Sequence, residues 1–92
     1  MAVYVDSCFI QARVGRITAR WCHLIADDLK ELHAFAAKIG LKREWAQLDG
    51  LGLPHYDVTE SKRSRALANG ARVIGREDFV ARMRAYRDAR RQ

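Results

Sequence analysis

Strand-like and helical segments alternate along this chain of 92 residues, and that alternation limits its fold more than any other feature. The clearest segment is a helix predicted between Asp28 and Gly40. Asp28 is a good N-cap, Glu31 completes a capping-box pattern, and Gly40 suits the C-terminal cap. Strand-like runs at residues 2–5 and 18–26 precede this helix. Together these segments predict an α/β domain.

The second half of the chain repeats the pattern with shorter segments. It predicts strands at 43–48, 55–58 and 71–74 and helices at 60–69 and 76–90. Thr59 is a suitable N-cap and Gly70 a suitable C-terminal cap for the first of these helices. Residues 11–16 contain Gly15 and predict a turn or flexible loop.

The expected fold is one small α/β domain spanning residues 1–92. We expect four or five short strands in a mostly parallel or mixed sheet, with an antiparallel first pair as one option, and about three helices. Residues 88–92 form a basic C-terminus that is expected to fray. The size of the chain is compatible with a monomer and with a homodimer.

Charge is the main compositional signal of function. The chain has 17 Lys and Arg against 11 Asp and Glu, a net charge of +6, which favours phosphate-rich partners such as nucleic acid. Plain solubilising charge is the alternative. The two cysteines have no zinc-finger spacing, and neither a signal peptide nor an apolar run of membrane-spanning length is visible. The sequence therefore predicts a cytoplasmic protein without a membrane partner.

The densest polar stretch, residues 55–63, lies at a predicted strand-to-helix junction. Free backbone N–H groups and the positive end of the helix dipole make such a junction a candidate anion site. Cations in the first helical turn oppose that dipole, which favours a bound anion; the alternative is that they extend into solvent. In this stretch the candidate ligand-binding residues are His55, Tyr56, Asp57, Ser61, Lys62 and Arg63.

Trp45 and Gln47 alternate on a predicted strand and would share one of its faces. A tryptophan beside an amide is suited to stacking on a base or sugar and reading its edge, so both are candidate ligand-binding residues. A place in the core is the simpler expectation for Trp45.

A divalent metal is the candidate cofactor. Asp6 ends the first predicted strand, where ligands gather in open α/β sheets. Carboxylates and imidazoles bind Zn, Mn or Mg, so the candidate ligands are Asp6, His23, His33, His55 and Asp57. The alternatives are that Asp6 caps a turn and that His23 and His33 are half-buried, hydrogen-bonded residues.

The chain also resembles a domain-of-unknown-function family of short bacterial and phage proteins. The resemblance covers residues 2–74 and rests on the pattern YVD…CHLIAD…ELHA…IG…W-x-Q…HYD…SKR…GA. It implies a class without implying an activity. Relatives often carry a second acidic residue where this chain has Ser7, which weakens a paired-carboxylate metal site built on Asp6.

Three functions remain open, so the sequence does not decide whether the protein is an enzyme. The first is a binding module for a phosphate-bearing ligand, a nucleotide or nucleic acid, at residues 55–63. The alternative is a metal-dependent phosphohydrolase or nuclease that uses Asp6, Asp57 and the histidines. The third is a structural or interaction protein with no small-molecule site.

Overall fold

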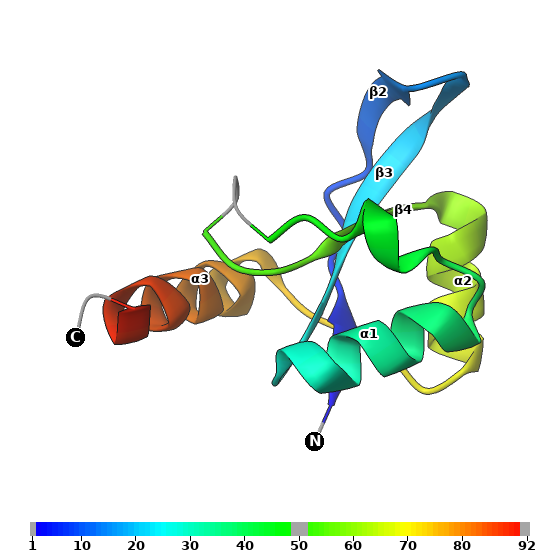
Figure 1. Ribbon diagram of the computed structural model, residues 1–92. Helices are drawn as coiled ribbons and strands as arrows, with labels where there is room; N and C mark the ends of the chain where they lie inside the picture. The colour runs from blue at the N-terminus through cyan, green and yellow to red at the C-terminus, as the bar shows by residue number, and fades with distance from the viewer. Residues whose placement is uncertain (1, 49–51, 91–92) are drawn as a thin grey trace.

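The computed structural model describes residues 2–48 and 52–90. Three helices and a five-stranded mixed sheet form a small α/β domain, as the sequence predicts (Figure 1). The elements in chain order are β1 (Val3–Val5), β2 (Ile10–Val14), β3 (Ile17–Ala26), α1 (Leu29–Lys38), the short 3-10 helix η1 (Arg43–Trp45), β4 (Tyr56–Thr59), α2 (Glu60–Ala68), β5 (Arg72–Val73) and α3 (Arg76–Arg90).

β3 is the central strand of the sheet. It pairs antiparallel with β2 along its first half, with β4 along its middle and with β1 at its end. β5 joins β1 in parallel. The mixed sheet is therefore confirmed, as is the antiparallel pairing of the first two predicted strands, but parallel pairing does not dominate.

The two faces of the sheet carry separate apolar clusters. Side chains alternate across a strand, so Cys22 and Leu24 lie on one face and His23 and Ile25 on the other. The first face packs against α1 and α2. On the second face, Ile25 clusters with Phe79 of α3. Figure 1 accordingly shows α1 and α2 near each other and α3 set apart from both.

The N-caps predicted at Asp28 and Thr59 are confirmed, whereas Glu31 Oε1 has no hydrogen-bond partner among the described residues. The Asp28 side chain accepts a hydrogen bond from the Glu31 amide, and the Thr59 side chain accepts one from the Lys62 amide. Gly40 and Gly70 follow the two helices with positive φ values of 86° and 103°. These left-handed conformations are the ones that favour glycine after a helix.

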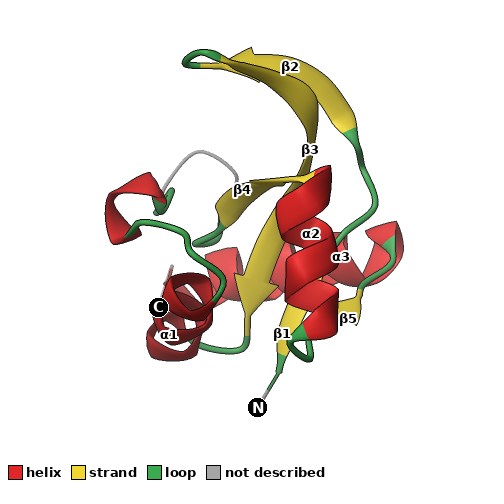
Figure 2. Cartoon of the chain, turned by 90° about the vertical axis from the view of Figure 1, so that its right-hand side faces the viewer, coloured by secondary structure: helices red, strands yellow, loops and turns green. Residues whose placement is uncertain are grey.

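The prediction of a loop at residues 11–16 is wrong. Residues Ile10–Val14 form β2, and Val14 pairs with Ile17 across a tight turn at Gly15, whose φ is 62°. Ile10, Val14 and Ile17 are all about half exposed. The hairpin extends beyond the rest of the sheet (Figure 2), so β2 lacks the buried face that makes a strand recognisable in sequence.

The prediction of a strand at residues 43–48 is also wrong. Arg43–Trp45 form a 3-10 turn in which the Trp45 amide donates to the Lys42 carbonyl at 2.9 Å. Only Gln47 makes a sheet-like bridge, to His55. Trp45 is 51% exposed, so it does not belong to the core, and it does not share a strand face with Gln47.

The C-terminal prediction is settled only in part. α3 continues to Arg90, and residues 91–92 of the predicted frayed segment lie outside the described residues. Within residues 2–48 and 52–90, every helix is too short or too polar to cross a membrane.

Candidate functional site

The pairing of β3 with β4 assembles the most concentrated group of ionisable side chains on the second face of the sheet. His23 lies directly opposite Asp57 across these strands. His55 shares the face of Asp57 because the two are separated by one residue. The Nε2 atoms of His23 and His55 lie 3.9 Å and 3.6 Å from the same oxygen, Oδ1 of Asp57.

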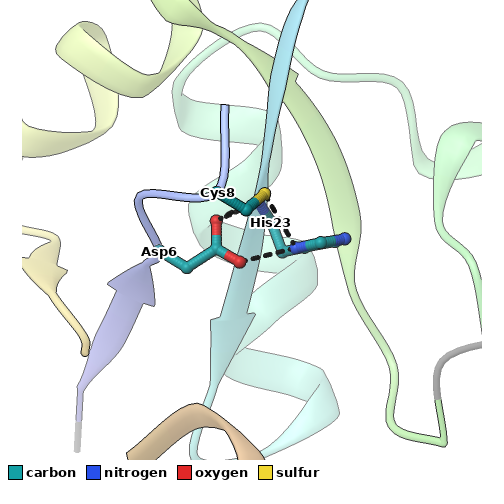
Figure 3. Close-up of side chains that lie close together, drawn as sticks. All are labelled: Asp6, Cys8 and His23. Carbon is teal, nitrogen blue, oxygen red and sulfur yellow. Dashed lines mark hydrogen bonds and ion pairs between the residues drawn. The ribbon is translucent and has the colours of Figure 1, made fainter. Parts of the chain in front are cut away.

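Asp6 fixes the orientation of the His23 ring. Its Oδ2 lies 2.6 Å from His23 Nδ1, and its Oδ1 accepts a hydrogen bond of 2.8 Å from the His23 backbone amide (Figure 3). On the neutral ring, the proton therefore belongs on Nδ1, and Nε2 keeps its lone pair. The structure thus brings two of the candidate ligands, Asp6 and His23, into direct contact.

The Asp6–His23 contact also shifts both pKa values. Burial raises the pKa of Asp6, but the hydrogen bonds from the side chain and backbone of His23 outweigh burial, so the net shift is downward. The hydrogen bond to Asp6 raises the pKa of His23 against the opposing effect of burial. Both shifts favour the charged pair in the metal-free protein.

His55 and Asp57 are held by their own neighbours. His55 Nδ1 lies 3.0 Å from the carbonyl oxygen of Leu53, an acceptor only, so Nδ1 donates and Nε2 carries the lone pair. The side-chain amide of Gln47 donates a short hydrogen bond to Oδ2 of Asp57. Gln47 thereby leaves Oδ1 of Asp57 directed at the two histidines.

The site is partly sheltered but open to solvent at one side. The His55 side chain is 4% exposed, His23 is 17% exposed and Asp57 is 28% exposed. The Phe79 ring from the first turn of α3 lies 5.4 Å from the His23 ring, centroid to centroid, and shields it. Asp57 is therefore the most exposed of these three side chains.

A second group of potential metal ligands lies on the other side of His23. It consists of Asp6, Cys8 and His23, with the Cys8 sulfur 3.5 Å from Asp6 Oδ1 and 3.6 Å from His23 Nδ1 (Figure 3). This group would need His23 Nδ1, which is already bonded to Asp6. Because Nε2 is the available atom, His23, His55 and Asp57 form the better metal site.

His33 and Tyr56 do not join this group. Tyr56 points into the opposite face of the sheet, is 1% exposed and places its hydroxyl 2.7 Å from His33 Nδ1. Burial lowers the pKa of His33, and the positive charge of Arg43 adds to that effect. His33 is therefore a hydrogen-bonded histidine, the alternative given for it above. The other four candidate metal ligands come together, with Asp6, His55 and Asp57 all near His23.

The cations of α2 contact backbone oxygens. Lys62 Nζ donates to the carbonyl of Ile39, at the end of α1, at 3.1 Å. Arg63 donates to the carbonyl of Asp6 and to the hydroxyl of Ser7, each at 2.9 Å. The Ser61 hydroxyl lies 3.2 Å from that of Thr59, the cap. These contacts connect α2 to the end of α1 and to the residues that follow β1. Through its hydrogen bond to the Asp6 carbonyl, Arg63 also holds the backbone of Asp6 in place.

Three contributors to the site were missed by sequence reasoning: Leu53, Cys8 and Phe79. Leu53 contributes a backbone carbonyl, which carries no residue-specific signal. Cys8 follows Asp6 by two residues, so its proximity was readable from spacing. Phe79 has the spacing of an ordinary apolar helix residue, and only the packing of α3 on the sheet brings it to His23.

Two surface hollows lie away from this chemistry. One lies between β1 and α3 and is lined by Tyr4, Asp78 and Arg82, among others. The other lies beside α1 and includes Val3 and Phe35. Neither includes a candidate metal ligand. A metal site requires ligand atoms that point to one position and does not require a large cavity. The group of His23, His55 and Asp57 is therefore the candidate site.

The Cys8 thiol is expected to react slowly with alkylating agents. Partial burial and the Asp6 carboxylate raise its pKa to about 11. At pH 8 we expect alkylation by iodoacetamide to be ~100-fold slower than for a free cysteine, because the thiolate is the reacting form. Site-resolved mass spectrometry measures this rate, and Asp6→Asn should increase it. A Cys8 that reacts as fast as free cysteine would show that the Asp6 contact is absent.

The comparisons with known proteins agree with the resemblance noted in the sequence. The family described as protein of unknown function (DUF4031) matches residues 3–86, which is most of the chain. No curated protein and no solved structure matches. With its family match extending from β1 into α3, the chain belongs to the DUF4031 family, a family of unknown function.

Proposed function

We propose that the protein binds one divalent transition-metal ion through His23, His55 and Asp57 and uses it to hydrolyse a phosphate ester. One observation carries the proposal. Both imidazoles have their Nδ1 hydrogen engaged, by Asp6 and by the Leu53 carbonyl, while both Nε2 atoms face a single carboxylate oxygen. A histidine that donates its other N–H to a carboxylate or carbonyl is the usual arrangement of a metal ligand.

The ligand types restrict the metal. Two imidazoles and one carboxylate are ligand types that suit Zn and Mn. Mg instead prefers a site in which all the ligands are oxygen atoms. Three protein ligands leave a coordination position for water, as in catalytic rather than structural zinc sites. The partial exposure of Asp57 keeps that position accessible to a substrate.

The chemistry would be hydrolysis by a metal-activated water. Coordination lowers the pKa of water to about 7, so hydroxide forms near neutral pH. The oxygen of this hydroxide would form a bond to phosphorus while the bond from phosphorus to the leaving oxygen breaks. The leaving oxygen would then take a proton from solvent. The net charge of +6 favours a phosphate-bearing substrate over a neutral ester or an amide.

The ligand proposed here is still the phosphate-bearing ligand predicted from sequence. Its main contact, however, would be the metal and not the start of α2. Lys62 and Arg63 donate hydrogen bonds to backbone oxygens, so their positive charges would attract a phosphate from beside the metal site.

A second candidate function, a binding module without catalysis, is supported by Trp45. Its exposed indole has the Lys42 ammonium 5.6 Å from the ring centre, a surface suited to stacking on a base.

Hydrolysis of bis(p-nitrophenyl) phosphate tests the proposal. The metal-free protein should be inactive, and Zn or Mn should confer turnover above that of the free ion. Asp57→Asn should reduce turnover to the free-ion level, because it removes the ligand charge while keeping the side-chain shape. His33→Gln, on the opposite face of the sheet, should leave turnover unchanged.

The results that would contradict the hydrolase proposal also distinguish it from the binding module. Equal turnover by wild type and Asp57→Asn would overturn the metal-hydrolase proposal. Nucleotide binding that quenches the fluorescence of Trp45, with no ester hydrolysed in the presence of any of these metals, would favour the binding module instead.

A further inference from the structure

We propose that the substrate of this site is a single-stranded nucleic acid, bound along α3 by Tyr86, Arg87 and Arg90. This inference rests on the proposed function, because it names the substrate class of the same site. It starts from the Phe79 ring, which lies 5.4 Å from the ring of His23. α3 therefore begins at the metal site and runs outward from it to Arg90 (Figure 1).

The helical face that contacts the site becomes aromatic and cationic further along. Phe79 and Met83 are four residues apart and lie on the face that packs against the sheet. Tyr86, Arg87 and Arg90 continue that face, since they follow Met83 by three, four and seven residues. The Arg90 guanidinium lies 5.6 Å from the centre of the Tyr86 ring.

This combination matches what single strands need. Aromatic rings stack on bases, while arginines contact phosphates and add cation–π attraction. Tyr86 is partly exposed, and Arg87 and Arg90 are exposed. Within residues 2–48 and 52–90 no carboxylate forms an ion pair with either arginine, in contrast to Arg82, which lies 2.8 Å from Asp27. Their charge is therefore available to a partner.

The length of α3 distinguishes a polynucleotide from a smaller phosphate ester as the expected substrate. At 1.5 Å per residue, Phe79 and Arg90 are separated by about 16 Å along the helix axis. A mononucleotide at the metal cannot also reach Arg90, whereas a strand of several nucleotides can. Affinity should therefore increase with the length of the oligonucleotide.

The test is fluorescence anisotropy with labelled thymidine oligonucleotides of increasing length and EDTA-treated full-length protein, so that no cleavage occurs. The wild type should bind longer strands more tightly and should lose affinity with salt. Arg87→Ala/Arg90→Ala should reduce the salt slope by about 1.4, at ~0.7 for each lost phosphate contact. Between 50 and 200 mM salt, the wild type should then lose affinity about sevenfold more than this variant.

Two controls make the result specific. Lys30→Ala/Lys38→Ala removes the same charge from α1, which covers the opposite face of the sheet, and should keep the wild-type slope. Circular dichroism checks that the arginine variant retains its helix, because arginines near a helix C-terminus also stabilise the dipole. Equal slopes for wild type and Arg87→Ala/Arg90→Ala would overturn the proposal, as would duplex DNA that binds as tightly as single strands.

The failures of the two proposals are distinguishable. Binding of Zn by the wild type without any oligonucleotide binding would sink the nucleic-acid inference and leave the metal site intact. Length-dependent oligonucleotide binding by a protein that takes up no metal would support the α3 surface and contradict the proposed hydrolase.

Discussion

Zn at 100 times its dissociation constant is expected to raise the unfolding temperature of this protein by ~10–20 °C. Binding to the folded state alone contributes about 2.7 kcal/mol at that concentration. For a domain of this size, 1 kcal/mol corresponds to about 4–8 °C. The ligand atoms of His23, His55 and Asp57 come from two strands, β3 and the start of β4, so the unfolded chain does not present them together. Scanning calorimetry with and without Zn measures the shift.

Variants identify which residues cause the shift. Asp57→Asn and His55→Ala should abolish most of it, whereas His33→Gln should keep it. Asp57→Asn is the cleaner variant, because Asp57 is 28% exposed while His55 is almost fully buried. A shift of the same size in Asp57→Asn would mean that Zn binds elsewhere on the chain.

The second large effect is expected in the core. Leu24 is fully buried at the point where β3 pairs with both β1 and β4. Leu24→Ala should lower the free energy of unfolding by ~2–5 kcal/mol, because it leaves a cavity that the sheet cannot close. Total stability for small domains is about 5–15 kcal/mol, so this is a large share. Urea unfolding should show a lower midpoint at an unchanged slope.

Ile17→Ala is the matched control for that variant. Ile17 lies on the same strand but is 54% exposed in the projecting hairpin. Its loss should cost less than about 1 kcal/mol, as for surface positions in general. Similar losses for both variants would mean that β3 is not buried where the structure buries it.

The junction before α2 illustrates what was predictable from sequence. Thr59 is recognisable as a cap because its hydroxyl can serve the free amides of the first helical turn, which is a local effect. The separation of Tyr56 from His55 and Asp57 follows from the alternation of side chains in a strand. Both effects depend on neighbouring residues only. The structure contains the Thr59 cap, and it places Tyr56 against His33 while Asp57 lies beside His55.

The misassigned segments and the site itself depend on contacts between distant segments. The segment 43–48 makes only one sheet-like bridge, from Gln47 to His55, and residues 43–45 form a 3-10 turn. The pairing of His23 with Asp57 requires the register of β3 against β4, which spacing alone does not give. Asp6 reaches the His23 ring through the pairing of β1 with β3, and Gln47 reaches Asp57 beside its bridge to His55.

The central claim is that one metal ion binds the Nε2 atoms of His23 and His55. Nitrogen-15 NMR of the histidine rings during titration with Zn tests it most directly. We expect one equivalent of Zn to shift the Nε2 signals of His23 and His55, while their Nδ1 atoms keep their protons and His33 is unchanged. A shift of His33, loss of the Nδ1 proton of His23, or three unchanged rings would show that the metal does not bind in this way.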